Sequence, residues 1–173
     1  MSEPFRIYLD LDETLIHSII CRGNDGQRRR INLDGEKYSV MERSLAKSMV
    51  ADCRAIARTF ILTTAMREYA EAVNSVLGFG FLPEDILTRH DYIAERDGET
   101  DAVLRSGIAP NSVLIDNESP QFLYSRIKMD FLGIDANRYF TVRRFNGRDP
   151  DKFAAEWDNI LSAVRHIAEQ SPV

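Results

Sequence analysis

The chain has 173 residues, a net charge of -5 at pH 7, 44% apolar residues and 28% charged residues. This length suits one domain, so we expect residues 1–173 to fold as a single unit around their own core. The negative charge argues against a nucleic-acid partner, because phosphate backbones attract basic surfaces. The sequence has two cysteines, no leader-like N-terminus and no apolar run near the ~18 residues of a membrane span. We therefore expect a cytoplasmic protein without a membrane partner.

Apolar strands and helical segments alternate along the chain. In chain order we expect a strand at 5–11, a hairpin flap at about 17–43, a helix at 44–58, a strand at 60–62, a helix at 67–77, a strand at 86–87, a short helix at 101–106, strands at 112–115 and 139–142, and a last helix from Pro150 to 167 with Asp149 as its cap. Asp34-Gly35 is a strong hairpin-turn signal within the flap. The alternation predicts an α/β fold, a three-layer Rossmann-like parallel sheet with helices on both faces and no large cap domain.

Three of the expected strands end at polar residues. Asp10, the pair Thr63-Thr64 and Asp116 each stand at the carboxyl end of a strand. Ligands of such parallel sheets bind beyond the carboxyl ends of the strands. We therefore expect these residues to form one site.

The acidic segment from Asp10 to Leu15 allows three interpretations. A calcium loop would need glycine at its sixth position and glutamate at its twelfth, where this chain has Leu15 and Cys21. A solvated acidic turn is disfavoured by the apolar residues on both sides of the segment. A phosphoryl-transfer site remains.

The spacing suits that chemistry. Asp10 would attack phosphorus and form an aspartyl-phosphate. Asp12 would protonate the leaving oxygen and then activate a water molecule, while the Thr14 hydroxyl would brace the turn. Three carboxylates, those of Asp10, Asp12 and Asp116, would repel an anionic substrate, so a cation is required, and an all-oxygen site favours Mg²⁺.

These residues resemble a known family. DLDETLIHS at 10–18 resembles the first motif of the haloacid dehalogenase phosphatases, and within them the small C-terminal-domain phosphatases and nuclear LIM-interactor-interacting factors, which act on phosphoserine in the tail of RNA polymerase II. INLDGEKYSVMER at 31–43 resembles the flap of that family, FILTTAMREYA at 60–70 its second motif, and VLIDNESP at 113–120 its fourth motif with one inserted residue.

The resemblance implies a role for each matching residue. The metal ligands would be Asp10, Asp12 and Asp116, and the phosphate-binding hydroxyl would be Thr64, with Thr63 as the alternative. Substrate contacts would also come from three further residues, Thr14, Arg43 and Asn117.

One residue of the family pattern is missing from its expected place. The family has a lysine shortly before the fourth motif, a position that falls near Thr100, and no lysine lies between Lys47 and Lys128. An arginine can also neutralise a phosphoryl group, although with different geometry. We expect Arg96 to do so, ahead of two alternatives, Arg89 and Arg105.

The sequence thus predicts a Mg²⁺-dependent phosphomonoester hydrolase. The short flap leaves the site open, which favours a macromolecular substrate such as a phosphoserine or phosphothreonine protein. A small phosphometabolite and a nucleic-acid 3′-phosphate are alternatives. A non-catalytic binding protein on the same fold is an alternative of another class, favoured by the missing lysine and opposed by the intact acidic residues.

Overall fold

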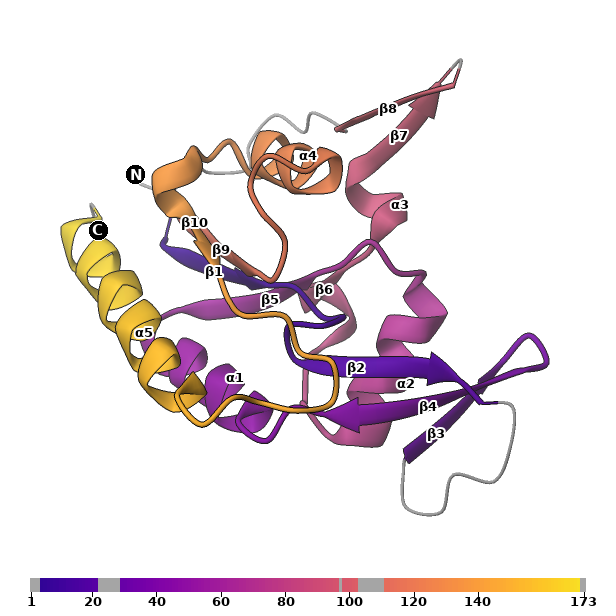
Figure 1. Ribbon diagram of the computed structural model, residues 1–173. Coiled ribbons are helices and arrows are strands. Elements are labelled where there is room, and N and C mark those ends of the chain that lie inside the picture. The colour runs from indigo at the N-terminus through magenta and orange to yellow at the C-terminus, as the bar shows by residue number, and fades with distance from the viewer. Residues whose placement is uncertain (1–3, 22–28, 97, 103–110, 172–173) are drawn as a thin grey trace.

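The computed structural model describes residues 4–21, 29–96, 98–102 and 111–171 (Figure 1). A five-stranded parallel sheet lies at the centre, in the order β10-β9-β1-β5-β6. Its strands are β1 (Arg6–Leu9), β5 (Arg58–Leu62), β6 (Ile86–Leu87), β9 (Ser112–Asp116) and β10 (Tyr139–Thr141). The expected α/β fold with a parallel sheet is confirmed.

Helices cover both faces of this sheet. One face packs against α1 (Ala46–Ile56), α2 (Arg67–Leu77) and α5 (Phe153–Gln170), and the other packs against α3 (Arg89–Tyr92) and α4 (Leu123–Leu132). Successive side chains of a strand point to opposite faces. Accordingly Ile7 and Leu9 enter the first core, and Tyr8 enters the second. Two single-turn 3-10 helices, η1 (Pro83–Asp85) and η2 (Ala136–Arg138), precede β6 and β10.

The flap is an antiparallel sheet in the order β2-β4-β3, beside α2 (Figure 1). Its strands are β2 (Ile16–Ile20), β3 (Arg29–Leu33) and β4 (Glu36–Glu42). Asp34 and Gly35, with φ angles of 49° and 82°, form the turn between β3 and β4. Two successive residues with positive φ are typical of a tight hairpin turn, so the Asp-Gly signal is confirmed.

A second hairpin was not expected. It consists of β7 (Ile93–Arg96) and β8 (Glu99–Ala102), which pair in antiparallel register. The helix expected at 101–106 is therefore wrong at 101 and 102, which lie in β8, and its remainder lies outside the described residues. Cross-strand pairing overrides the weak helical preference of this short segment.

Two helices differ from expectation. α5 begins at Phe153 instead of Pro150, and Asp149 does not cap it, because its carboxylate lies 2.9 Å from Arg43 Nε. α4 was not expected at all, although Gly133 ends it in the left-handed conformation that favours glycine, with φ at 65°. In the described ranges, no helix has both the length and the apolar character that a bilayer span requires.

Candidate active site

The strand register brings the acidic residues together. Leu9 in β1 is paired with Ile115 in β9 and Ile61 in β5. The residue that follows β1, Asp10, therefore lies beside Asp116, and its backbone N–H donates to the Ile115 carbonyl at 2.9 Å. Asp10 and Asp116 thus meet at the carboxyl edge of the sheet, as expected.

A tight turn follows β1. The Leu11 carbonyl accepts hydrogen bonds from the backbone N–H groups of Leu15 at 2.9 Å and Ile16 at 3.2 Å. Glu13 has a φ of 64°, which is a costly conformation for a residue other than glycine. Its carbonyl accepts from Phe145 N–H at 2.7 Å, and its N–H donates to Ile16 at 2.6 Å. These bonds hold the turn in a shape that lets two acidic side chains from one strand end face one pocket.

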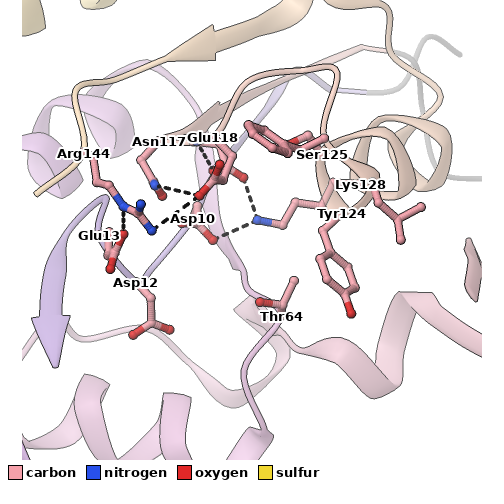
Figure 2. A pocket seen from close by; sticks show the side chains of 13 residues that line it. Asp10, Asp12, Glu13, Thr64, Asn117, Glu118, Tyr124, Ser125, Lys128 and Arg144 are labelled. Atoms are coloured by element: carbon pink, nitrogen blue, oxygen red, sulfur yellow. Dashed lines mark hydrogen bonds and ion pairs between the residues drawn. The ribbon is translucent and has the colours of Figure 1, made fainter. Parts of the chain in front are cut away.

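A pocket of about 510 Å³ opens over this edge of the sheet (Figure 2). It is lined by Asp10, Asp12, Glu13, Thr64, Asp116, Asn117, Glu118, Phe122, Leu123, Tyr124, Ser125, Lys128 and Arg144. Its floor is polar and charged. Three consecutive apolar residues, Phe122 to Tyr124, form part of its rim and are 43% to 59% exposed.

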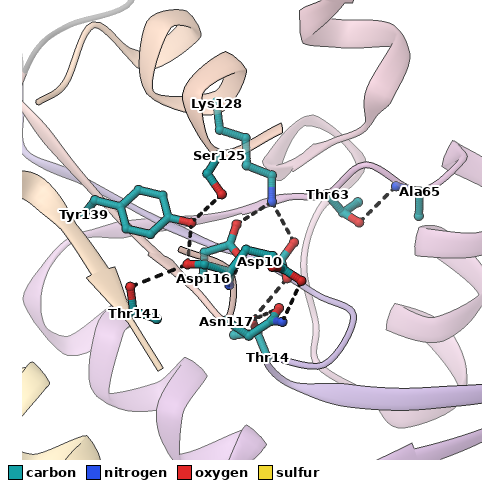
Figure 3. A network of polar contacts seen from close by, with 11 residues as sticks. Asp10, Thr14, Thr63, Ala65, Asp116, Asn117, Ser125, Lys128, Tyr139 and Thr141 are labelled. Carbon is teal, nitrogen blue, oxygen red and sulfur yellow. Dashed lines mark hydrogen bonds and ion pairs between the residues drawn. The ribbon is translucent and has the colours of Figure 1, made fainter. Parts of the chain in front are cut away.

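Lys128 supplies a buried cation to the site. Its Nζ lies 2.8 Å from Asp10 Oδ1 and 2.6 Å from Asp116 Oδ2, and the residue is only 3% exposed (Figure 3). Burial alone would lower the pKa of the Lys128 ammonium, but the two carboxylates together raise it well above its usual value. Lys128 therefore stays charged between its partners.

The packing of α4 explains how this lysine reaches the site. Ile127 and Phe131 are buried in the second core and fix the helix against the sheet. Tyr139 in β10 places its hydroxyl 2.9 Å from Ser125 Oγ, less than one turn before Lys128. The helix thus crosses above the carboxyl edge, with Lys128 directed at the two aspartates.

The expectation that an arginine replaces a missing lysine is wrong. A lysine fills the position, from a helix that follows the fourth motif instead of from a segment that precedes it. Arg96 lies in β7 of the second hairpin, where only its backbone is described, and Arg89 pairs with Glu95 at 3.0 Å. Arg105 lies outside the described residues. Helical spacing of Ile127 and Phe131 ahead of Gly133 was the sequence signal for α4.

The carboxylate of Asp10 is buried and held by two donors. Lys128 binds Oδ1, and Thr14 Oγ1 donates to Oδ2 at 3.1 Å. Burial, followed by the charge of Asp116, raises the pKa of Asp10 to about 7, while Lys128 opposes the shift. Thr14 is fully buried, so its hydroxyl braces Asp10 from within the turn and does not face the pocket as a substrate contact.

Three oxygens converge beside Asp10. Asn117 Oδ1 lies 3.2 Å from Asp10 Oδ2 and 3.0 Å from the Asp12 carbonyl oxygen. Acceptors this close repel one another unless the amide turns its nitrogen inwards or a cation lies between them. Neighbouring ligands of octahedral Mg²⁺, at bonds of about 2.1 Å, are separated by about 3.0 Å. The donor set at this point therefore fits Mg²⁺.

Asp116 is less well placed as a metal ligand. Its Oδ2 accepts from Lys128, and its Oδ1 accepts from the Glu118 N–H at 3.0 Å. Within the described part of the chain, no three His, Cys, Asp or Glu side chains converge as a metal site would require. The geometry thus favours Asn117 over Asp116 as the third ligand beside Asp10 and the Asp12 carbonyl, and gives Asp116 the task of holding Lys128.

Asp12 turns its side chain towards α2. Tyr69 donates to Asp12 Oδ1 at 2.6 Å, a contact that the sequence did not reveal, because nothing in the motif at 60–70 indicates which way its tyrosine points. Burial raises the pKa of Asp12, and the hydrogen bond from Tyr69 opposes that shift. Since the residue also lines the pocket, it can donate a proton to a group bound above Asp10.

The two threonines after β5 have different environments. Thr64 is half-buried and lines the pocket, as expected of a phosphate-binding hydroxyl. Thr63 is 1% exposed, and its Oγ1 accepts from the Ala65 N–H at 3.1 Å. The substrate-binding role considered for Thr63 is therefore wrong, because its hydroxyl shapes the turn after β5.

Arg43 is also a structural residue. Its side chain is fully buried, and its Nη1 donates to the Thr14 carbonyl at 2.7 Å. Its Nε forms an ion pair with Asp149 at 2.9 Å without the angle of a hydrogen bond, and its guanidinium lies 4.0 Å from the centre of the Phe153 ring. Burial lowers the pKa of Arg43, and Asp149 opposes the shift. The expected substrate contact of Arg43 is wrong, because the segment before α5 covers it.

A buried aspartate at the end of the first strand, a lysine beside it and a parallel α/β sheet fit the haloacid dehalogenase phosphatases that the sequence motifs resemble. The model of the NLI interacting factor-like phosphatases matches residues 6–171, so the chain belongs to that family.

Two solved structures resemble the fold. One is the fission yeast RNA polymerase II CTD phosphatase Fcp1 bound to beryllium fluoride, with a TM-score of 0.57 and 14% identity over 96% of this chain and 54% of that chain. The other is Fcp1, an essential RNA polymerase II CTD phosphatase, with a TM-score of 0.54, 14% identity, and 96% and 52% of the two chains covered. This chain thus spans about half the length of each. No curated protein matches the sequence.

Proposed function

We propose that this phosphatase is Mg²⁺-dependent, acts through an aspartyl-phosphate on Asp10, and dephosphorylates a protein side chain. One observation carries the proposal. The Asp10 carboxylate lies at the floor of an open pocket, 2.8 Å from Lys128, with Asp12 beside it on the same turn. This arrangement combines a nucleophile, a fixed cation and an acid within reach of one phosphoryl group.

The residues of the chain divide the reaction into two steps. Asp10 attacks phosphorus, the bond to the leaving oxygen breaks, and Asp12 gives that oxygen its proton. Asp12 then takes a proton from water, the resulting hydroxide attacks phosphorus, and the bond to Asp10 breaks. Lys128 offsets the negative charge of Asp10 and of the phosphoryl oxygens throughout.

The metal would be held by oxygens on one side of Asp10. We assign Asp10 Oδ2, the Asp12 carbonyl and Asn117 Oδ1 as its protein ligands, since Asn117 Oδ1 lies 3.2 Å and 3.0 Å from the other two oxygens, close to the separation of neighbouring Mg²⁺ ligands. When bound, Mg²⁺ neutralises and polarises the phosphoryl oxygens. The amide of Asn117 would then present oxygen to the metal instead of nitrogen to the two acceptors.

The rim of the pocket supports a macromolecular substrate. Phe122 is 59% exposed, and its neighbours Leu123 and Tyr124 are 46% and 43% exposed. An exposed apolar patch of this kind beside a charged floor suits a chain segment that carries the phosphate. The similar fission yeast protein is a phosphatase of the RNA polymerase II CTD, which also favours a phosphorylated protein. The net charge of -5 disfavours nucleic acid.

The alternative of a non-catalytic binding protein depended on the missing lysine. Lys128 removes that argument, because both aspartates have their cation. Asp10, Asp116 and Lys128 are all buried at the pocket floor, where each charged group costs free energy to desolvate. A catalytic role explains this cost better than a binding role does.

Substitution of the nucleophile tests the proposal. Asp10→Asn should lower kcat/KM for p-nitrophenyl phosphate by on the order of 10³-fold or more, because covalent catalysis loses its attacking group. Asp158→Asn, an exposed position on α5, is the matched control and should match wild type. EDTA should abolish the wild-type activity and added Mg²⁺ restore it. Full activity of Asp10→Asn, or full activity in EDTA, would refute the mechanism.

A further inference from the structure

Tyr69 in α2 connects the flap to the acidic turn. Its hydroxyl lies 2.6 Å from Asp12 Oδ1 and 2.7 Å from Ser18 Oγ in β2. An ionised Asp12 can only accept, and a phenol has one proton to donate. Tyr69 therefore donates to Asp12, and Ser18 donates to Tyr69. The two bonds form a directed chain from flap to carboxylate, in which each bond polarises the next.

The ring of Tyr69 is held in place for this contact. It packs edge-on against Tyr38 in β4, with 5.7 Å between the ring centroids. A phenol has one proton to donate, and the 2.6 Å contact directs that proton to Asp12 Oδ1. A helix and two flap strands thus fix one hydroxyl against one oxygen of Asp12.

We propose that Tyr69 is a positioning residue for the general acid and that Ser18 extends this positioning into the flap. By binding Oδ1, Tyr69 leaves Oδ2 of Asp12 to carry the proton to the leaving oxygen. When that proton departs as the phosphorus–oxygen bond breaks, Asp12 becomes an anion, and its hydrogen bond from Tyr69 becomes charge-assisted and stronger. Tyr69 thereby favours the transfer itself. The inference rests on the acid role proposed above for Asp12.

A leaving-group series separates this role from a structural one. A poor leaving group needs the proton of Asp12, whereas p-nitrophenolate leaves with little help. Tyr69→Phe should lower kcat/KM for phenyl phosphate by on the order of tenfold, a fraction of what a general acid contributes. For p-nitrophenyl phosphate the loss should stay below about threefold, so kcat/KM should depend more steeply on leaving-group pKa than in wild type. Ser18→Ala should also steepen the dependence of kcat/KM on leaving-group pKa, but less than Tyr69→Phe does.

Two further variants complete the test. Tyr38→Phe removes a hydroxyl from the neighbouring ring without touching the chain of bonds, and should keep the wild-type dependence. Asp12→Asn sets the full effect of losing the acid. If Asp12→Asn spares phenyl phosphate, the acid role of Asp12 fails. The inference on Tyr69 is overturned if Asp12→Asn steepens the dependence of kcat/KM on leaving-group pKa but Tyr69→Phe and Ser18→Ala do not. In that outcome these two variants lower kcat/KM for all substrates by the same factor, or for none. The acid role of Asp12 then stands. Ser18→Ala alone decides if Tyr69→Phe does not fold.

Discussion

Two buried cations of this protein, Lys128 and Arg43, serve different purposes. Lys128 is 3% exposed, and its ammonium group lies between two carboxylates at the floor of the pocket. Arg43 is fully buried, and its guanidinium binds backbone carbonyls, one carboxylate and an aromatic face. Burial and charge alone therefore do not distinguish a catalytic cation from a structural one.

The partners make the distinction. The planar guanidinium of Arg43 points its N–H groups at several fixed acceptors at once, so no N–H group is left to bind a ligand. The ammonium of Lys128 is a compact charge, and both of its partners, Asp10 and Asp116, belong to the pocket lining. With one cation between two carboxylates, the Lys128 cluster also retains excess negative charge, which disfavours folding and suits a site that receives a metal ion.

Of the two buried cations, Lys128 should have the larger effect on kcat/KM when it is removed. Lys128→Met should lower kcat/KM by about 10²–10³-fold, the scale seen when one preorganised charge partner is removed. It should also lower the free energy of unfolding by about 3–5 kcal/mol, because two buried carboxylates lose their partner. Steady-state kinetics and urea denaturation measure the two effects.

The control for Lys128→Met is Lys47→Met, which removes a lysine whose side chain is 56% exposed. Lys47→Met should change neither kcat/KM nor the free energy of unfolding appreciably. The double variant Lys128→Met with Asp10→Asn should recover part of the stability but none of the activity. An active Lys128→Met protein would show that Lys128, like Arg43, is structural.

Arg43→Met should affect stability and spare chemistry. We expect the free energy of unfolding to fall by about 3 kcal/mol, because Asp149 and the Thr14 carbonyl lose a buried partner. Below the unfolding temperature, kcat/KM should stay within about fivefold of wild type, since the guanidinium does not line the pocket. A large loss of kcat/KM at unchanged stability would contradict the contrast with Lys128.

The sequence predicted the residues of the strand ends better than those of the helices. Asp10, Thr64 and Asp116 could be placed because each follows a short apolar strand, and parallel strands bring their carboxyl ends to one edge. Lys128 could not be placed without α4, and its distance from Asp116 along the chain gives no indication of contact. The expected position of the lysine came from a family pattern, whereas physics requires only that a cation reach the two carboxylates.

The role of Arg43 was misjudged for a related reason. Its position after the flap suggested a substrate contact, but the side chain is covered by the segment that includes Phe145 and Asp149. That segment lies about 100 residues away in sequence. Burial by a distant segment is a tertiary property that local patterns do not encode. Asp149 itself was expected to cap the last helix, and the same ion pair removed it from that role.

The burial of Asp10 and the excess negative charge around Lys128 lead to a prediction for the pH dependence of stability. In the folded, metal-free protein the pKa of Asp10 is about 7 instead of 3.8, so folding favours the protonated form. The stability that depends on this proton is present at low pH and is lost as the pH rises towards 7. Asp10→Asn cannot lose it. In EDTA, the free energy of unfolding of Asp10→Asn should therefore rise relative to that of wild type by on the order of 1–2 kcal/mol between about pH 5 and pH 8. If the difference in free energy of unfolding between the two proteins does not change with pH, Lys128 already neutralises the excess negative charge of Asp10.

The smallest predicted effect on kcat/KM comes from Phe122, which lies at the start of the segment that carries Lys128. Phe122, just before α4, is 59% exposed on the rim, so it can touch only a substrate that extends out of the pocket. Phe122→Ser should lower kcat/KM for a phosphoserine peptide by about fivefold, equivalent to about 1 kcal/mol of lost apolar contact. It should leave p-nitrophenyl phosphate within about twofold, whereas Lys128→Met impairs both substrates equally. Leu82→Ser, at an apolar residue 56% exposed away from the pocket, is the control and should change neither. If Phe122→Ser and Leu82→Ser behave alike on the peptide, the rim does not contact the substrate, and the argument for a protein substrate loses its structural support.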